Sequence, residues 1–107
     1  MRHILFVCGK NKLRSPTAEA IFCDQGGYEV RSAGLNNDAE VPLGAEDVKW
    51  ADLIFLMEKT HKTKLQKRFK SFLKNQKLIV LDIPDEYDFM EEALVRILTE
   101  KVSRFLT

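Results

Sequence analysis

ILFVCGKNKLRSP, residues 4–16, opens with a run of strand-forming apolar residues and ends on a helix start signal. Ile4 to Val7 is typical of a strand that is buried on both faces. Ser15 before Pro16 is typical of a helix N-cap with proline at the first helical position. A strand, a polar loop and a helix within about 25 residues form the first half of a βαβ unit. The stretch therefore predicts a parallel α/β fold.

The rest of the chain continues this alternation. Further strands are predicted at residues 28–31, 52–57 and 78–81. Helices are predicted at 15–25, 42–50 and 59–72, and from 93 to the C-terminus. In the last helix, helical spacing relates Ala93, Leu94, Ile97, Leu98, Val102 and Phe105. This order predicts a three-layer α/β sandwich with a four-stranded parallel sheet, in a single domain over residues 1–107.

The composition is typical of a soluble cytoplasmic protein. The 107 residues are 45% hydrophobic and 31% charged, with a net charge of +1. No apolar run approaches the roughly 20 residues that span a bilayer, and the apolar start leads into a polar loop rather than a cleavage site. Two cysteines make no disulfide framework, and neither Cys8 nor Cys23 is paired with histidines at metal-ligand spacing. We predict no metal and no cofactor.

Residues 61–70 are basic, and Lys74 and Lys77 follow them. Leu65 and Phe69 fall on one side of the predicted helix, with the lysines elsewhere, as in an ordinary amphipathic helix with a solvated face. A nucleic-acid-binding patch is the alternative, and it would make association steeply salt-dependent. We expect neither a nucleic acid nor a membrane as partner, and the sequence does not give the oligomeric state.

Three segments leave predicted strands at the same edge of the sheet. They are Cys8–Arg14, Met57 with Glu58, and Asp82–Tyr87. Ligands of parallel α/β sheets bind at the carboxyl ends of the strands, near the point where the strand order reverses. Cys8 and Asp85 are therefore predicted to meet in one crevice.

The loop Cys8–Arg14 has the properties of an anion-binding loop. Successive backbone N–H groups between a buried strand and a helix N-terminus form a nest that attracts a phosphate-like dianion. Arg14 adds a planar fork that matches two phosphate oxygens. The same positive field favours the thiolate of Cys8 and lowers its pKa. A thiolate beneath a bound phosphorus is a nucleophile for phosphoryl transfer, and Ser15 can donate a hydrogen bond to the sulfur.

Several motifs resemble those of one enzyme family. The pattern Val7-Cys8-x-x-Asn11-x-x-Arg14-Ser15-Pro16-x-Ala18-Glu19 resembles the active-site signature of the low-molecular-weight protein tyrosine phosphatases. Residues 32–34, 51–58 and 83–87 are similar, in family order, to the end of its second strand, its third strand and its general-acid segment. The resemblance implies hydrolysis of phosphotyrosine or another phosphomonoester through a cysteinyl-phosphate intermediate.

The resemblance also implies a role for each matching residue. The expected catalytic residues are Cys8 as nucleophile, Arg14 as phosphate ligand and Asp85 as general acid. The expected substrate-binding residues are Gly9, Lys10, Asn11, Lys12, Leu13 and Ser15, with Tyr87 as an aromatic wall. Ser32 would support the loop, through hydrogen bonds that Asn11 makes with Ser15 and Ser32. The implied substrate is a phosphorylated protein or a small phosphomonoester.

The chain also departs from the family pattern. Lys10 replaces a glycine, Leu13 replaces a second cysteine found in many members, and Glu86 replaces the proline after the acid. Asp82 is a second candidate for the acid. The span 34–51, which in the family carries an aromatic specificity loop and a further helix, is much shorter, so a more open pocket is expected. Trp50, beside that span, is predicted to pack in the core.

Two other functions fit the same loop. Arsenate reductases share it, but they need two further cysteines, and here only Cys23 remains, which we predict to be a core thiol pointing away from the loop. The other alternative is a phosphate- or phosphoprotein-binding module with little or no catalysis. It is favoured by the short chain and the altered acid motif, and opposed by the intact Cys8, Arg14 and Ser15.

Overall fold

The computed structural model describes residues 2–9, 13–23, 26–36 and 38–106. Its four strands are β1 (Arg2–Cys8), β2 (Tyr28–Gly34), β3 (Leu53–Leu56) and β4 (Lys77–Val80). They form one sheet in the order β2-β1-β3-β4, and every pairing is parallel. The predicted four-stranded parallel sheet is confirmed.

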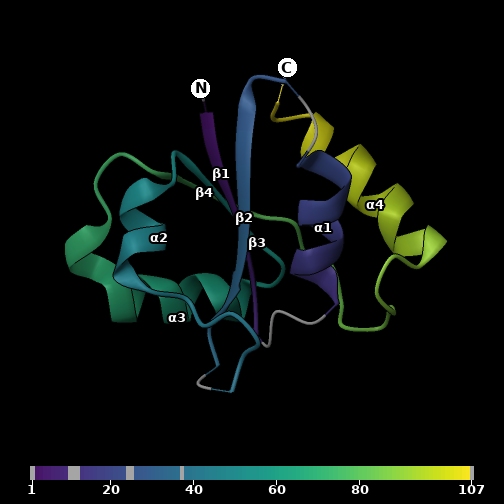
Figure 1. Ribbon diagram of the computed structural model, residues 1–107. Helices are drawn as coiled ribbons and strands as arrows, with labels where there is room; N and C mark the ends of the chain where they lie inside the picture. The colour runs from purple at the N-terminus through teal and green to yellow at the C-terminus, as the bar shows by residue number, and fades with distance from the viewer. Residues whose placement is uncertain (1, 10–12, 24–25, 37, 107) are drawn as a thin grey trace.

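Helices cover both faces of this sheet (Figure 1). They are α1 (Arg14–Phe22), α2 (Ala45–Trp50), α3 (Lys59–Phe69) and α4 (Glu92–Ser103), and a 3-10 turn, η1 (Lys70–Phe72), extends α3. Figure 1 shows α1 and α4 on one side of the sheet and α2 and α3 on the other. The predicted three-layer sandwich is confirmed. Among the described residues, no helix combines the length and apolar character needed to cross a membrane.

The central strand β1 explains why the sheet needs two helical layers. Ile4 and Phe6 point into one apolar cluster, which Leu94, Leu98 and Val102 of α4 complete. Leu5 and Val7 alternate into a second cluster, which includes Val48, Leu65 and Phe69 from α2 and α3. All residues from Ile4 to Val7 are fully buried. Because successive side chains of a strand point to opposite faces, an uninterrupted apolar strand is stable only with cover on both sides.

Three details of the predicted core are wrong. In α4 the buried stripe is Leu94, Leu98 and Val102, whereas Ala93 is exposed and Phe105, beyond the helix end, is 38% exposed. Cys23 is exposed at the end of α1 and is not a core thiol, because Ala18 and Phe22 take the inward positions of that helix.

Trp50, the third detail, is half-buried at the edge of the second cluster rather than inside the core. Its ring stacks on the ring of His3, with centroids 4.4 Å apart, and the guanidinium of Arg31 lies 4.1 Å from its centre. Its amphipathic ring therefore lies between core and surface polar groups.

The start of α1 is also different from the prediction. The helix begins at Arg14 with Leu13 as its cap residue, so Ser15 lies within the first turn and is not the N-cap. The carbonyl of Leu13 accepts from the N–H of Thr17 at 3.1 Å and from its Oγ1 at 2.6 Å. Pro16 is tolerated because the first N–H groups of a helix have no intrahelical acceptor.

Candidate functional site

A cavity of about 300 Å³ lies at the carboxyl edge of the sheet. Its lining residues are Cys8, Gly9, Leu13, Arg14, Asn36, Glu58, Thr60, His61, Lys64 and Asp85. The cavity lies at the ends of the neighbouring strands β1 and β3. The strand order β2-β1-β3-β4 reverses there, because β2 lies on one side of β1 and β3 lies on the other. This is the expected ligand position in an open parallel sheet. The structure brings Cys8 and Asp85 to one cavity, as the topology predicted.

Cys8 is the last residue of β1, and its side chain is buried. The segment after β2 fixes the backbone of Cys8 and of the next residue, Gly9. The N–H of Leu35 donates to the carbonyl of Cys8 at 2.9 Å, and the N–H of Asn36 donates to the carbonyl of Gly9 at 2.8 Å. The Asn36 amide packs so closely on Gly9 that a Cβ there would lie 3.4 Å from its Nδ2. The turn that carries the thiol is therefore held from the second strand.

The loop after Cys8 is described only at its two ends. Gly9 and Leu13 line the cavity, whereas Lys10, Asn11 and Lys12, three of the predicted anion-binding residues, lie outside the described residues.

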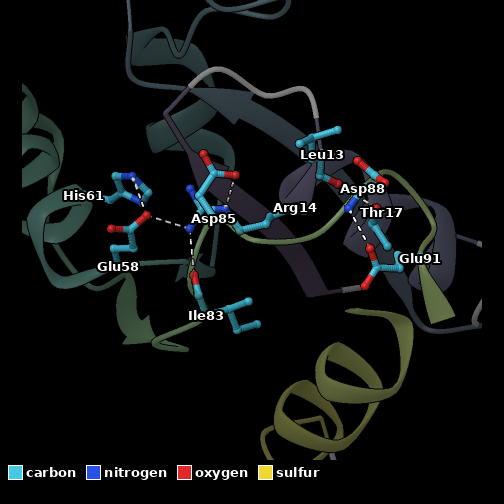
Figure 2. Close-up of polar contacts among 9 residues, drawn as sticks. All are labelled: Leu13, Arg14, Thr17, Glu58, His61, Ile83, Asp85, Asp88 and Glu91. Carbon is cyan, nitrogen blue, oxygen red and sulfur yellow. Dashed lines mark hydrogen bonds and ion pairs between the residues drawn. The ribbon is translucent and has the colours of Figure 1, made fainter. Parts of the chain in front are cut away.

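Arg14 is held by groups from two other parts of the sheet edge. Arg14 is buried, with 5% of the residue exposed. Its Nη1 donates to Oε2 of Glu58 at 2.6 Å and to the carbonyl of Ile83 at 2.7 Å. Nε lies 3.8 Å from Oδ1 of Asp85. Figure 2 shows the guanidinium between these three residues. Charge-assisted bonds of this kind fix the planar group, so the cavity carries a preoriented cation.

Sequence reasoning assigned no role to Glu58 or His61, although both line the cavity. The hydrogen bond from Arg14 lowers the pKa of Glu58 below its usual value of 4.5, so this carboxylate stays ionised. His61 is buried, and its burial lowers its pKa below 6.5. Its Nε2 lies 3.9 Å from Oε2 of Glu58, and its buried Nδ1 has no hydrogen-bond partner among the described residues.

Two serines were predicted around the loop. Ser15 is fully buried, and its Oγ has no hydrogen-bond partner in the described part of the chain. Ser32 donates from Oγ to Oε1 of Glu19 on α1, at 2.5 Å. Their expected common partner, Asn11, lies outside the described residues, so the predicted support of the loop stays a prediction.

The segment after β4 carries the predicted acid. Asp85 lines the cavity with a side chain that is 64% exposed, whereas Asp82 is not among the lining residues and has a left-handed backbone, with φ of 57°. Tyr87 is half-buried against the first apolar cluster and is also not among the lining residues. Its predicted function as an aromatic wall stays a prediction.

Two backbone hydrogen bonds attach this segment to the rest of the site. The N–H of Ile83 donates to the carbonyl of Met57 at 2.8 Å. The N–H of Met90 donates to Oγ1 of Thr17 on α1 at 3.0 Å. Figure 2 shows Thr17 between Leu13 and the segment that carries Asp88 and Glu91. The position of Asp85 is therefore determined jointly by the third strand and the first helix.

Two further features bear on this site: the second cysteine and possible metal ligands. Cys23 is not among the residues that line the cavity. Within residues 2–9, 13–23, 26–36 and 38–106, no group of three or more His, Cys, Asp or Glu could hold a metal ion. A second cavity, of about 570 Å³, lies at the opposite edge, where Asp52 and Gln76 precede β3 and β4.

Comparisons with known proteins agree with this geometry. The family described as low molecular weight phosphotyrosine protein phosphatase has a model that matches residues 3–43, which include β1 from His3 onward, the loop, α1 and β2. No curated protein sequence matches the chain.

Solved structures match the fold over nearly all of the chain. The YwlE arginine phosphatase from Geobacillus stearothermophilus is 23% identical, with a TM-score of 0.77 over 99% of this chain and 93% of that one. The low molecular weight protein tyrosine phosphatase from Streptococcus pyogenes is 15% identical, with a TM-score of 0.79 over 100% and 95%. The tyrosine phosphatase Wzb from Escherichia coli, in complex with phosphate, is 18% identical, with a TM-score of 0.77 over 96% and 94%.

The parallel sandwich, with its cavity at the carboxyl edge of β1 and β3, has the fold of these solved phosphatase structures. Within this fold, residues 3–43 match the model of the low molecular weight phosphotyrosine protein phosphatase family.

Proposed function

We propose that this protein is a cysteine-dependent phosphatase that removes phosphate from phosphorylated protein side chains, with phosphotyrosine as its substrate. The observation that carries the proposal is that Cys8, Arg14 and Asp85 all line one cavity at the carboxyl edge of the sheet. These residues supply the three groups that hydrolysis of a phosphate ester needs: a nucleophile, a cation and an acid.

In this proposal, the phosphate binds between the start of α1 and the end of β1. Arg14 donates to two of its oxygens, and backbone N–H groups of the loop hold the rest. Glu58 is a positioning residue: it binds Nη1 of Arg14 and so keeps the guanidinium plane at the cavity wall. No metal or cofactor takes part, because the loop and Arg14 supply the positive charge.

The first chemical step transfers the phosphoryl group to the protein. The thiolate of Cys8 attacks phosphorus, an S–P bond forms, and the bond from phosphorus to the phenolic oxygen breaks. Asp85 gives its proton to the leaving oxygen, so tyrosine departs as a neutral phenol. Asp85 suits this function because its side chain lines the cavity and is partly open to solvent.

The second step restores the protein. Asp85, now ionised, takes a proton from a water molecule whose oxygen attacks phosphorus, and the S–P bond breaks. Inorganic phosphate leaves, and Cys8 is again a thiolate. The buried hydroxyl of Ser15, in the first turn of α1, is proposed to donate to the sulfur as it departs.

Phosphoarginine is a second candidate substrate. The cavity presents two carboxylates, Glu58 and Asp85, and paired carboxylates suit a guanidinium leaving group. The protein that resembles this chain from Geobacillus stearothermophilus is an arginine phosphatase, and other similar structures are tyrosine phosphatases. Turnover of matched phosphotyrosine and phosphoarginine peptides by the same preparation separates the two substrates.

Hydrolysis of p-nitrophenyl phosphate by the wild-type protein and by the Cys8→Ser variant tests the proposed function. We expect turnover by the wild type and none by the variant, with phosphate binding retained by both. Phosphate binding without turnover by the wild type would instead support a binding module. Reduction of arsenate with a thiol reductant would support the arsenate reductase alternative.

A further inference from the structure

Arg14 and Glu58 pair with each other in the cavity wall, and the other lining residues that carry a full charge are Lys64 and Asp85. Helix α3 contributes Thr60, His61 and Lys64 to the lining, and the segment after β4 contributes Asp85. Residues 59–77 contain eight lysines and arginines and no acidic residue. Residues 82–92 contain six acidic residues and no lysine or arginine. A nearly neutral chain thus has a cationic helix and an acidic segment that both contribute to the wall of one cavity.

The lysines of α3 and η1 are not neutralised by neighbours. Lys59, Lys64, Lys67 and Lys70 are exposed, and none makes an ion pair with the described residues. The arginines of α4 differ, because Arg96 pairs with Glu92 at 2.9 Å and Arg104 pairs with Glu100 at 3.0 Å. The positive charge of α3 is therefore available to a ligand.

A row of these cations leads out of the cavity. Residues three and four apart lie on one face of a helix, so Thr60, Lys64 and Lys67 share a face. Thr60 and Lys64 line the cavity, and Lys67 is one turn further along α3. We call Lys64 and Lys67 the α3 row. A ligand that fills the cavity can therefore contact Lys64, and a part of the same ligand that extends along α3 can contact Lys67.

We propose that the α3 row binds acidic residues that flank the phosphorylated residue of a protein substrate. This inference rests on the proposed function, because the phosphorylated residue must occupy the cavity. Lys64 belongs to both the cavity and the row, so the structure favours a ligand with a phosphate and additional negative charge beside it. Asp85 and the other carboxylates of the segment 82–92 repel such charge, so the acidic flank is favoured along α3.

Matched phosphopeptides test this inference. One peptide carries glutamates next to the phosphotyrosine, and the other carries glutamines at the same positions. We expect kcat/KM to be about fivefold higher for the glutamate peptide at low salt, which is the size expected of one or two surface charge pairs. The preference should shrink as salt is added, because added ions screen exposed charges.

Charge reversal locates the effect. Lys67→Glu should abolish the preference and leave the hydrolysis of p-nitrophenyl phosphate unchanged, since Lys67 does not line the cavity that this small substrate occupies. Lys49→Glu is the matched control: it changes the net charge equally but lies at the opposite edge of the sheet, beside the second cavity. The control should keep the preference.

The outcomes separate the inference from the proposed function. Failure to hydrolyse p-nitrophenyl phosphate and both peptides would overturn the proposed function. Equal kcat/KM for the two peptides, with normal hydrolysis of p-nitrophenyl phosphate, would overturn only the inference. It would also be overturned if a single-stranded oligonucleotide bound the wild type but not Lys67→Glu, without a preference between the peptides. The row would then be a nucleic-acid site.

Discussion

Nη1 of Arg14 donates to Oε2 of Glu58 across 2.6 Å, and this bond joins the first residue of α1 to the residue that follows β3 by two positions. Nη1 also donates to the carbonyl of Ile83 beyond β4. One buried guanidinium thus connects the ends of three elements around the cavity. Because Arg14 is buried, loss of its partner leaves a charge with poorer compensation in the protein interior.

We predict that Glu58→Gln lowers the free energy of unfolding at pH 7 by about 1 kcal/mol. This is the contribution of a charge-assisted hydrogen bond, reduced because Glu58 is partly exposed to solvent. Because Arg14 lowers the pKa of Glu58 in the folded state, this contribution is present above the unfolded value of 4.5 and is lost as pH falls through the lower folded value. Urea unfolding at several pH values measures both effects. Glu100→Gln, in an exposed pair with Arg104, is the control and should change little.

His61 predicts a second dependence of stability on pH. Burial lowers its pKa below 6.5 in the folded state, so the unfolded chain binds a proton first as pH falls. The free energy of unfolding should therefore decrease below about pH 6.5 through this group. His61→Leu keeps the apolar packing, removes the titration and should flatten the decrease. If the decrease persists in His61→Leu but disappears in His3→Gln, the assignment to His61 is wrong.

Asp85→Asn should lower kcat by about 10²–10⁴-fold, the usual contribution of a general acid. The loss should be larger for a phosphotyrosine peptide than for p-nitrophenyl phosphate, because the tyrosine phenolate is the poorer leaving group. The variant should also lose the basic limb of the pH–rate profile. Asp82→Asn is the control, since Asp82 does not line the cavity, and it should keep that limb. The opposite pattern would assign the acid to Asp82.

Thr17 joins the start of α1 to the segment that carries Asp85, because Oγ1 donates to Leu13 and accepts from the N–H of Met90. Thr17→Val keeps the shape of the side chain and removes both bonds. We expect a loss of about 1–3 kcal/mol in the free energy of unfolding, together with a lower kcat. Thr99→Val removes a hydrogen bond from Oγ1 to the carbonyl of Val95 on the exposed face of α4, and it serves as the control. Equal effects of the two substitutions would show that the link to Met90 is unimportant.

The sheet was predictable because its strands are short apolar runs separated by helical patterns. Ile4 to Val7 and residues 53–56 are buried on both faces, which only a covered parallel sheet allows. Helix ends were less predictable. Ser15 with Pro16 has the composition of a cap, but the hydrogen bonds of Thr17 to Leu13 start α1 at Arg14.

The meeting of Cys8 with Asp85 was predictable from topology, since both follow strands at one edge of the sheet. The network of Arg14 was not, because Glu58 is 44 residues away and Ile83 contributes a backbone carbonyl that no sequence pattern marks. Two signals were available. Glu58 follows the buried run that ends at Met57, and His61 continues the buried helical spacing of Leu65 and Phe69. A polar residue in an apolar stripe beside a sheet edge indicates a site.

The most direct test of the central claim is rapid quenching of wild-type protein with a phosphotyrosine peptide, followed by digestion and mass spectrometry. The proposed mechanism predicts a transient phosphoryl group on the peptide that contains Cys8, and a longer-lived one in Asp85→Asn, which cannot activate water. Cys8→Ser should give neither turnover nor a cysteinyl phosphate. Turnover that continues in Cys8→Ser at the wild-type rate, or a phosphoryl group on another residue, would contradict the account.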